Sequence, residues 1–238
     1  MNLIIGLIAI TIFYILTADA IKKVPVAFYV GIYFWTGFVI VYYSVRLYAT
    51  MPQWFTSYFM DIFQRGIFST VTFMIVMFLG TVRKHNKITK KLMKVRGEIS
   101  IIGCLSALCH NVIFGMIYFT MLFKNPELMS TRSLIASILT IVLLALMLPL
   151  LITSFRSVRR KMKAKTWKNV QRLAYPFFIL IYVHIMVLFT ADISKKIVSI
   201  AAYTAIYALY VILRLRKYFL KKNSPQNIAN EKTPAIVK

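Results

Sequence analysis

Long apolar runs separated by short polar links make up most of this 238-residue chain. A bilayer core about 30 Å thick needs about 20 apolar residues in a helix, and the runs approach or exceed that length. They cover approximately residues 2–19, 26–48, 65–82, 98–123, 133–155, 173–191 and 195–214. The first and sixth are short and the last two nearly touch, so six and seven crossings both remain open. The pattern predicts an all-α, polytopic transmembrane helical bundle of about seven helices, a six-helix core plus one.

Two links between the apolar runs are strongly basic. The link Arg83–Arg96 holds seven Lys and Arg and the link Arg156–Arg172 holds eight, with no acid in either. By contrast, residues 52–61 hold no Lys or Arg. Because cytoplasmic loops collect basic residues, the pattern predicts a multi-pass plasma-membrane protein with its amino terminus outside and its carboxyl terminus inside.

The same pattern divides the chain into three parts. Residues 1–64 are predicted to hold two transmembrane helices and an outer loop, and residues 65–214 the core of the bundle. Residues 215–238 begin with a basic segment and end in a polar stretch typical of a disordered cytoplasmic tail. The first apolar run has no basic segment before it and no small-residue cleavage site after it. It is therefore predicted to stay as a helix rather than be removed as a signal peptide.

Composition excludes other classes of protein. Hydrophobic residues make up 60% of the chain, which is too many for a soluble domain. Thirty Lys and Arg against six Asp and Glu give a net charge of +24, but they sit in blocks between apolar runs. Membrane orientation and anionic lipid headgroups explain such blocks better than nucleic acid does.

No nucleotide-binding glycine motif is present. Cys104 and Cys109 share one apolar run, which fits buried side chains rather than a redox or zinc motif.

Three histidines are the candidate chemistry of the chain. His85 lies in the first basic link, where a solvated surface side chain is the expected role. His110 and His184 lie inside apolar runs, where an ionisable side chain is costly and indicates a functional site. Counted from the basic ends of their helices, His110 is about 20 Å deep and His184 about 17 Å deep at 1.5 Å per residue. The two rings are therefore predicted at a similar depth, in the outer half of the bilayer.

Spacing alone leaves several uses for this pair open. Two histidines at equal depth can ligate a haem iron from both sides, and small residues before His110, at Gly103, Ser106 and Ala107, leave room for a flat macrocycle. The same small residues can instead allow close helix packing, with structural histidines hydrogen-bonded across the bundle. A proton relay or a lone metal site uses the same residue types. Intramembrane proteolysis is disfavoured because HExxH and GxSG motifs are missing.

Two stretches resemble the ferric reductase-like transmembrane family, b-type haem proteins that include the haem-binding subunit of the methionine sulfoxide reductase system. The first is LPLLITSFRSVRRKM, followed by Trp167, Gln171 and His184. The second is RGEISIIGCLSALCHNVIFGMIYF, with His110 at the position of a ligand. The resemblance covers approximately residues 65–190. It implies that His110 and His184 are axial ligands of haem iron within a core at residues 65–214.

Departures from the family pattern narrow this expectation. Members that hold two stacked haems carry a second histidine on each ligand helix, about four turns before the first. Here those positions are Gln171 and Arg96. The resemblance therefore implies one haem b toward the outer face, with Gln171 hydrogen-bonded at the start of its helix.

The resemblance also implies a function, that of a membrane component of an oxidoreductase. Electrons would pass from a quinol or a separate flavoprotein through the haem to an acceptor near the outer face. Arg132, Lys195 and Lys196 are candidates for the haem propionates by charge alone, although ordinary loop positions are the favoured role. The alternative is a non-redox membrane protein, a transporter subunit or an assembly scaffold, in which both histidines are structural.

Overall fold

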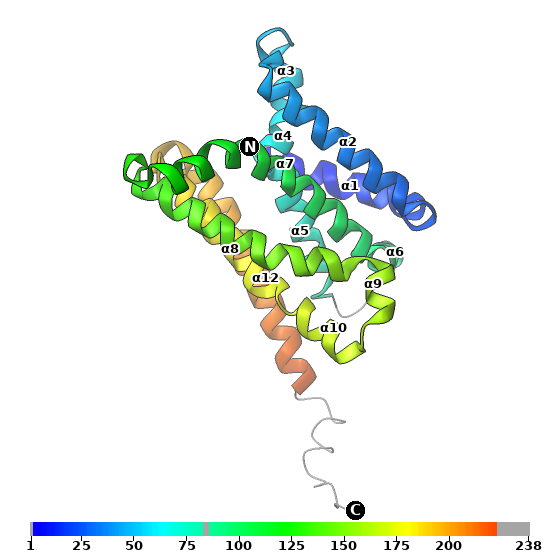
Figure 1. Ribbon diagram of the computed structural model, residues 1–238. Coiled ribbons are helices and arrows are strands. Elements are labelled where there is room, and N and C mark those ends of the chain that lie inside the picture. The colour runs from blue at the N-terminus through cyan, green and yellow to red at the C-terminus, as the bar shows by residue number, and fades with distance from the viewer. Residues whose placement is uncertain (1, 83–85, 223–238) are drawn as a thin grey trace, which may run out of the picture.

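The computed structural model describes residues 2–82 and 86–222, and every regular element in these residues is a helix (Figure 1). Six helical segments are long and apolar enough to cross a membrane, and a bent pair would make a seventh. The all-α, polytopic bundle expected from the sequence is confirmed. The six segments are α1 (Asn2–Lys23), α2 (Pro25–Ser44), α7 (Arg96–Lys124), α8 (Thr131–Ser154), α10 (Ala164–Gln171) joined to α11 (Ala174–Phe189), and α12 (Ile193–Lys222).

The remaining candidate span is broken. Its main part, α5 (Ile67–Leu79), is bent by 56° from a helical segment over residues 53–64, and Gly66 between them has a left-handed φ of 68°. That segment consists of α3 (Gln53–Phe55), the π-helix η2 (Thr56–Met60) and α4 (Asp61–Gln64). The prediction of an outer loop followed by one helix over 65–82 missed this break, because hydropathy continues through a glycine whose positive φ ends a helix.

Helix α5 lies in the interior of the bundle. Twelve of its 13 residues are buried, and it packs against α1, α7 and α11 (Figure 1). Its approach to α7 is close, because a Cβ on Gly103 would lie 2.8 Å from Thr72 Cγ2. The Thr72 hydroxyl also shares a hydrogen bond of 3.1 Å with the fully buried Tyr14 of α1. The helices that carry His110 and His184, α7 and α11, thus both pack against α5.

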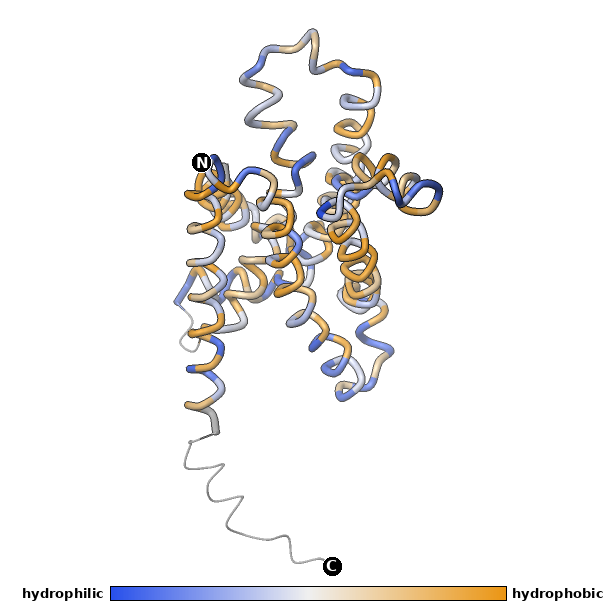
Figure 2. The backbone as a smooth tube through the Cα atoms, turned by 90° about the vertical axis from the view of Figure 1, so that its left-hand side faces the viewer, coloured by the Kyte–Doolittle hydropathy of each residue, from blue (hydrophilic) through white to orange (hydrophobic). Residues whose placement is uncertain are grey.

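Apolar side chains cover much of the outside as well. Leu16 in α1, Phe34 in α2 and Phe123 in α7 are 72%, 69% and 76% exposed. Figure 2 shows hydrophobic residues along the long helices and hydrophilic ones gathered mainly at turns and helix ends. Such an exterior suits a lipid environment, where each helix satisfies its own backbone hydrogen bonds.

The two basic links contain short helices at one end of the bundle, where the sequence predicted only links. These are α6 (Lys87–Lys94), α9 (Arg156–Lys161) and α10. Asn86 caps α6 by accepting a hydrogen bond of 2.8 Å from the Thr89 backbone. The buried Glu98 carboxylate pairs with Arg156, whose Nε and Nη2 both lie 2.6 Å from Oε1. The link that follows α8 is therefore tied to the start of α7.

Helix α12 reaches the same end of the bundle. The sequence predicted that it would end at 214, but it continues to Lys222. Lys217 Nζ donates a hydrogen bond of 2.8 Å to the Gly80 carbonyl, and Arg214 donates a longer one of 3.4 Å. Cations at the end of α5 are stabilised by the negative end of its helix dipole.

Candidate functional site

His110 of α7 and His184 of α11 face each other inside the bundle. Their ring centroids lie 6.5 Å apart and their planes are nearly perpendicular, at 89°. The expectation that the two histidines share one depth agrees with this distance. Two metal–nitrogen bonds of about 2 Å, plus about 1 Å from nitrogen to ring centre on each side, add up to roughly 6 Å, so one metal ion would fit between facing nitrogens.

The break before α5 positions His110. The Gln64 carbonyl, at the end of α4, accepts a hydrogen bond of 2.7 Å from His110 Nδ1. A carbonyl can only accept, so the proton is assigned to Nδ1 and the lone pair to Nε2. Gly66 makes this approach possible, because a Cβ there would lie 3.3 Å from His110 Cγ. A hydrogen bond from the second ring nitrogen to a carbonyl is how proteins orient a metal-ligating histidine.

His184 is held differently. Its Nδ1 is buried and has no hydrogen-bond partner within residues 2–82 and 86–222. The Ala136 backbone is the polar group that faces this ring, but the geometry does not meet that of a hydrogen bond. Buried polar atoms are nearly always paired, and the Ala136 backbone is the partner within reach of this nitrogen.

Both histidines line a cavity of about 580 Å³, which we call the histidine cavity. This volume falls within the range of about 300–1,000 Å³ that is usual for cofactor and ligand pockets. Its walls are mainly apolar and include Phe73, Leu143, Met147, Phe177, Ile181 and Leu188. A smaller cavity of about 150 Å³ also touches both rings. Open space therefore borders the histidine pair in two cavities.

Small residues before His110 have separate roles. Ala107 lines the histidine cavity, as expected for a residue that leaves room beside the ring. Gly103 instead allows α7 to approach α5, and the Ser106 hydroxyl donates to the Gly103 carbonyl at 2.9 Å. The helix-packing interpretation therefore holds for Gly103.

Two cations stand at the edge of the histidine cavity. Lys196 lines it, as does Arg65, which sequence reasoning missed and which also pairs with Asp61 at 2.9 Å. The other two candidates by charge, Arg132 and Lys195, do not line it. Lys195 lies 3.0 Å from Asp192, and the hydrogen bond from Lys195 lowers the pKa of the Asp192 carboxyl.

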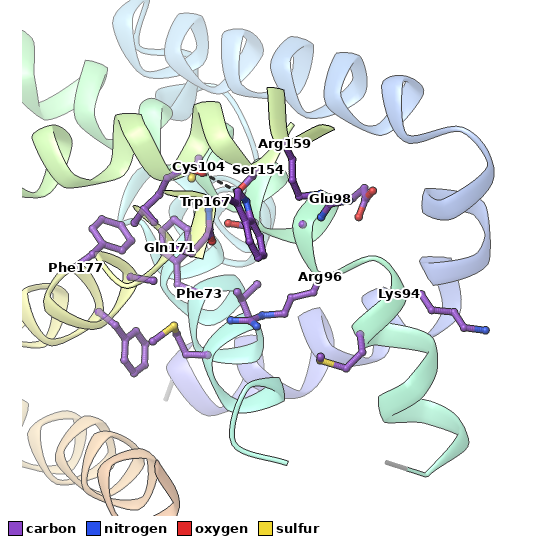
Figure 3. A pocket seen from close by; sticks show the side chains of 18 residues that line it. Phe73, Lys94, Arg96, Glu98, Cys104, Ser154, Arg159, Trp167, Gln171 and Phe177 are labelled. Carbon is purple, nitrogen blue, oxygen red and sulfur yellow. Dashed lines mark hydrogen bonds between the residues drawn. The ribbon is translucent and has the colours of Figure 1, made fainter. Parts of the chain in front are cut away.

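The positions four turns before the histidines lie at a second cavity. Arg96 and Gln171 both line this space of about 240 Å³, which we call the basic-end cavity (Figure 3). Gln171 Nε2 donates a hydrogen bond of 3.0 Å to Thr153 Oγ1, as expected, but Gln171 is the last residue of α10 and lies before α11 rather than at a helix start. The other residues that line the basic-end cavity include Phe73, Ser154, Arg159, Trp167, Phe177 and Phe178.

The two cysteines lie buried in α7. Cys104 and Cys109 are free and buried, which confirms their expected role as small apolar side chains. His85 lies outside the described residues. Within residues 2–82 and 86–222, no three His, Cys, Asp or Glu side chains come together as a metal site. The histidine pair therefore offers two imidazole rings, the number that a haem requires of a protein that fills both axial positions.

The fold and this site define a polytopic helical membrane protein with a histidine pair in its interior. The family model described as "Ferric reductase like transmembrane component" matches residues 65–182, and over these residues the chain belongs to the ferric reductase-like transmembrane family. The matched region contains His110 and ends two residues before His184.

A relative gives a further comparison. A protein of Treponema pallidum (strain Nichols), described only as uncharacterized, is 39% identical over 159 residues, which are 65% of this chain and 44% of that protein. The chain thus spans less than half the length of this relative. No solved structure matches the chain.

Proposed function

We propose that this protein is a membrane b-type cytochrome that carries electrons through one haem held by His110 and His184. One observation carries the proposal: the two rings face each other at 6.5 Å and both line a large, mainly apolar cavity. A purely structural pair would be packed against its neighbours, because protein interiors are close-packed and hold few voids larger than a water molecule. The family assignment of residues 65–182 supports an electron-transfer role.

Haem b suits the residues that surround this pair. Neutral imidazole is a good ligand for iron, and an apolar slot between helices suits a porphyrin. Lys196 and Arg65, at the edge of the cavity, are placed to pair with the two propionates. When bound, haem supplies a one-electron carrier, and two histidine ligands leave no open position for oxygen.

The chain's own groups prepare the site. The Gln64 carbonyl keeps the proton on His110 Nδ1 and so leaves the Nε2 lone pair free. Leu143, Met147 and Ile181 exclude water from the cavity, which lowers the local dielectric and thereby tunes the reduction potential.

The proposed electron path crosses the bundle toward the outer face. The donor is a quinol or a separate flavoprotein, and the acceptor lies outside a plasma membrane. Residues 65–214 form the haem-binding core, residues 1–64 flank it, and residues 215–238 form a cytoplasmic tail, of which 223–238 lie outside the described residues. The basic ends of α6, α9 and α10 face the cytoplasm in this arrangement, as the distribution of basic residues requires.

The test is an absorption spectrum of detergent-purified protein, expressed with a supply of haem and reduced with dithionite. We expect a shifted Soret band and the α-band of low-spin haem b. His110→Ala and His184→Ala should each abolish these bands, whereas His85→Ala, the matched control at the third histidine, should keep them. A colourless wild-type protein that inserts and folds normally would contradict the proposal and favour structural histidines.

A further inference from the structure

We propose that the basic-end cavity binds the phosphate of an anionic phospholipid, with Arg96 and Arg159 as its cationic contacts. The inference is independent of the haem proposal, because it rests on the other cavity and on its charges. Figure 3 shows the Arg96 side chain extended among the lining residues, whereas Lys94 points away from them.

The lining of the cavity carries excess positive charge. Glu98 is the one acid among its described lining residues, and Arg156 already pairs with Glu98 through two nitrogens at 2.6 Å. Neither Arg96 nor Arg159 makes an ion pair with any carboxylate in residues 2–82 and 86–222. Arg96 is partly buried, and removing a charged group from water without a counter-charge is costly. No carboxylate of the described residues supplies that charge here.

The end of α5 does not supply that charge either. A Cβ on Gly80 would lie 3.6 Å from Arg96 Nη2, so the guanidinium sits beside the negative end of this helix. The Gly80 carbonyl, however, already accepts hydrogen bonds from Arg214 and Lys217. Three cations therefore share one helix end that carries about half an elementary charge.

Arg159 also lines the cavity, close to the start of α7. A Cβ on Gly97 would lie 3.8 Å from Arg159 Nη1, which places this guanidinium beside the residue that follows Arg96. Its Cζ lies 6.0 Å from the centroid of the Trp167 ring, and Trp167 is fixed by a hydrogen bond of 3.1 Å to the Thr153 carbonyl. Arg96 and Arg159 both line this cavity, and a phosphate accepts bidentate hydrogen bonds from arginine.

Much of the remaining lining of the cavity is apolar. The apolar lining residues include Phe73, Met77, Leu150, Phe177 and Phe178. A free phosphate would gain nothing from these side chains, whereas the glycerol and first methylene groups of a phospholipid would bury apolar surface against them. Basic pockets between membrane helices are known to take anionic lipid headgroups. The mixed lining therefore favours a lipid over a soluble anion.

The test is native mass spectrometry of delipidated wild-type protein in detergent, titrated with phosphatidylglycerol. We expect one tightly bound copy, and at least tenfold weaker binding of phosphatidylcholine, whose headgroup carries no net charge. Arg96→Gln should weaken phosphatidylglycerol binding about tenfold, which corresponds to about 1.4 kcal/mol. Arg159→Gln should weaken it less, because Arg159 is more exposed, and Arg96→Lys should retain part of it.

The matched control is Lys165→Gln, which removes one charge from the same basic end but does not line the cavity. It should change the affinity less than twofold, and the melting temperature of each variant reports whether it still folds. Equal binding of both lipids, or equal losses in Arg96→Gln and Lys165→Gln, would overturn the proposal. Competition by millimolar inorganic phosphate would show a soluble anion instead of a lipid. Normal lipid binding by a colourless protein would refute the haem proposal alone.

Discussion

The histidine cavity and the basic-end cavity lie on the same helices but offer opposite chemistry. Phe73 and Phe177, whose rings meet edge to face at 5.1 Å, belong to the walls of both. One cavity has a volume of about 580 Å³ and presents two neutral imidazoles, while the other has about 240 Å³ and presents guanidinium groups. About four turns of helix separate each histidine from its counterpart.

This difference teaches that a few side chains, rather than the bundle itself, decide what each cavity can hold. Arg96 cannot ligate iron, because its guanidinium has no free lone pair at any ordinary pH. The Gln171 amide is already used within the protein, where it donates to Thr153. The basic-end cavity therefore presents no iron ligand at Arg96 or Gln171, the positions about four turns before the histidines.

The largest effect on stability should come from the ion pair at the basic end. Glu98→Gln leaves Arg156 without its carboxylate, and we expect the free energy of unfolding to fall by about 2–3 kcal/mol, less than for a fully buried pair because Arg156 is 43% exposed. Thermal or denaturant unfolding in detergent measures this change. Asp192→Asn, which breaks the surface pair with Lys195, should leave the free energy of unfolding nearly unchanged. Equal losses of unfolding free energy in the two variants would mean that the burial of Glu98 does not strengthen its ion pair.

A smaller loss is expected at the histidine cavity from Gly66→Ala. The left-handed φ of 68° should cost about 1–2 kcal/mol for a residue with a side chain, and the new methyl group would also crowd His110. Haem retention during gel filtration should therefore fall together with the melting temperature. Gly31→Ala is the matched control, since no atom lies within 4 Å of a Cβ there. A Gly66→Ala protein that holds haem as the wild type does would disprove the role of this break.

The smallest effect should separate two adjacent lysines. Lys196 lines the histidine cavity and Lys195 does not. Lys196→Gln should speed haem dissociation about three- to tenfold, as expected from losing one partly exposed charge pair of roughly 1 kcal/mol. Lys195→Gln should leave the rate unchanged. Haem transfer to an apo-globin acceptor measures both rates, and a larger effect at Lys195 would contradict the proposed propionate contact.

Much of this architecture could be predicted from the sequence. Long apolar runs report membrane helices directly, because length and hydropathy are local properties. His110 and His184 were paired by counting residues from basic ends, and helical rise converts such counts into depth with little error. The sequence also predicts a hydrogen bond for Gln171, although it places this residue at a helix start and the structure has it at the end of α10.

Other features required the structure. The π-helix before Gly66 and the contact of Gln64 with His110 depend on backbone angles and on a main-chain carbonyl, which no hydropathy window reports. The one sequence signal for this break is Gly66, which follows the polar pair Gln64-Arg65 within an apolar stretch. As a candidate for a haem propionate, Arg132 was favoured by charge as much as Lys196, but only Lys196 lines the histidine cavity. The sequence does not say which way a loop side chain points.

The most direct test of the central claim is the molar ratio of haem to polypeptide in the purified protein, measured as the pyridine haemochrome against quantitative amino-acid analysis. The account predicts one haem b per chain in the wild type, none in His184→Ala, and still one in Arg96→Gln, which alters only the basic-end cavity. Two haems per chain, or a folded wild-type protein without haem after expression with haem supply, would contradict it.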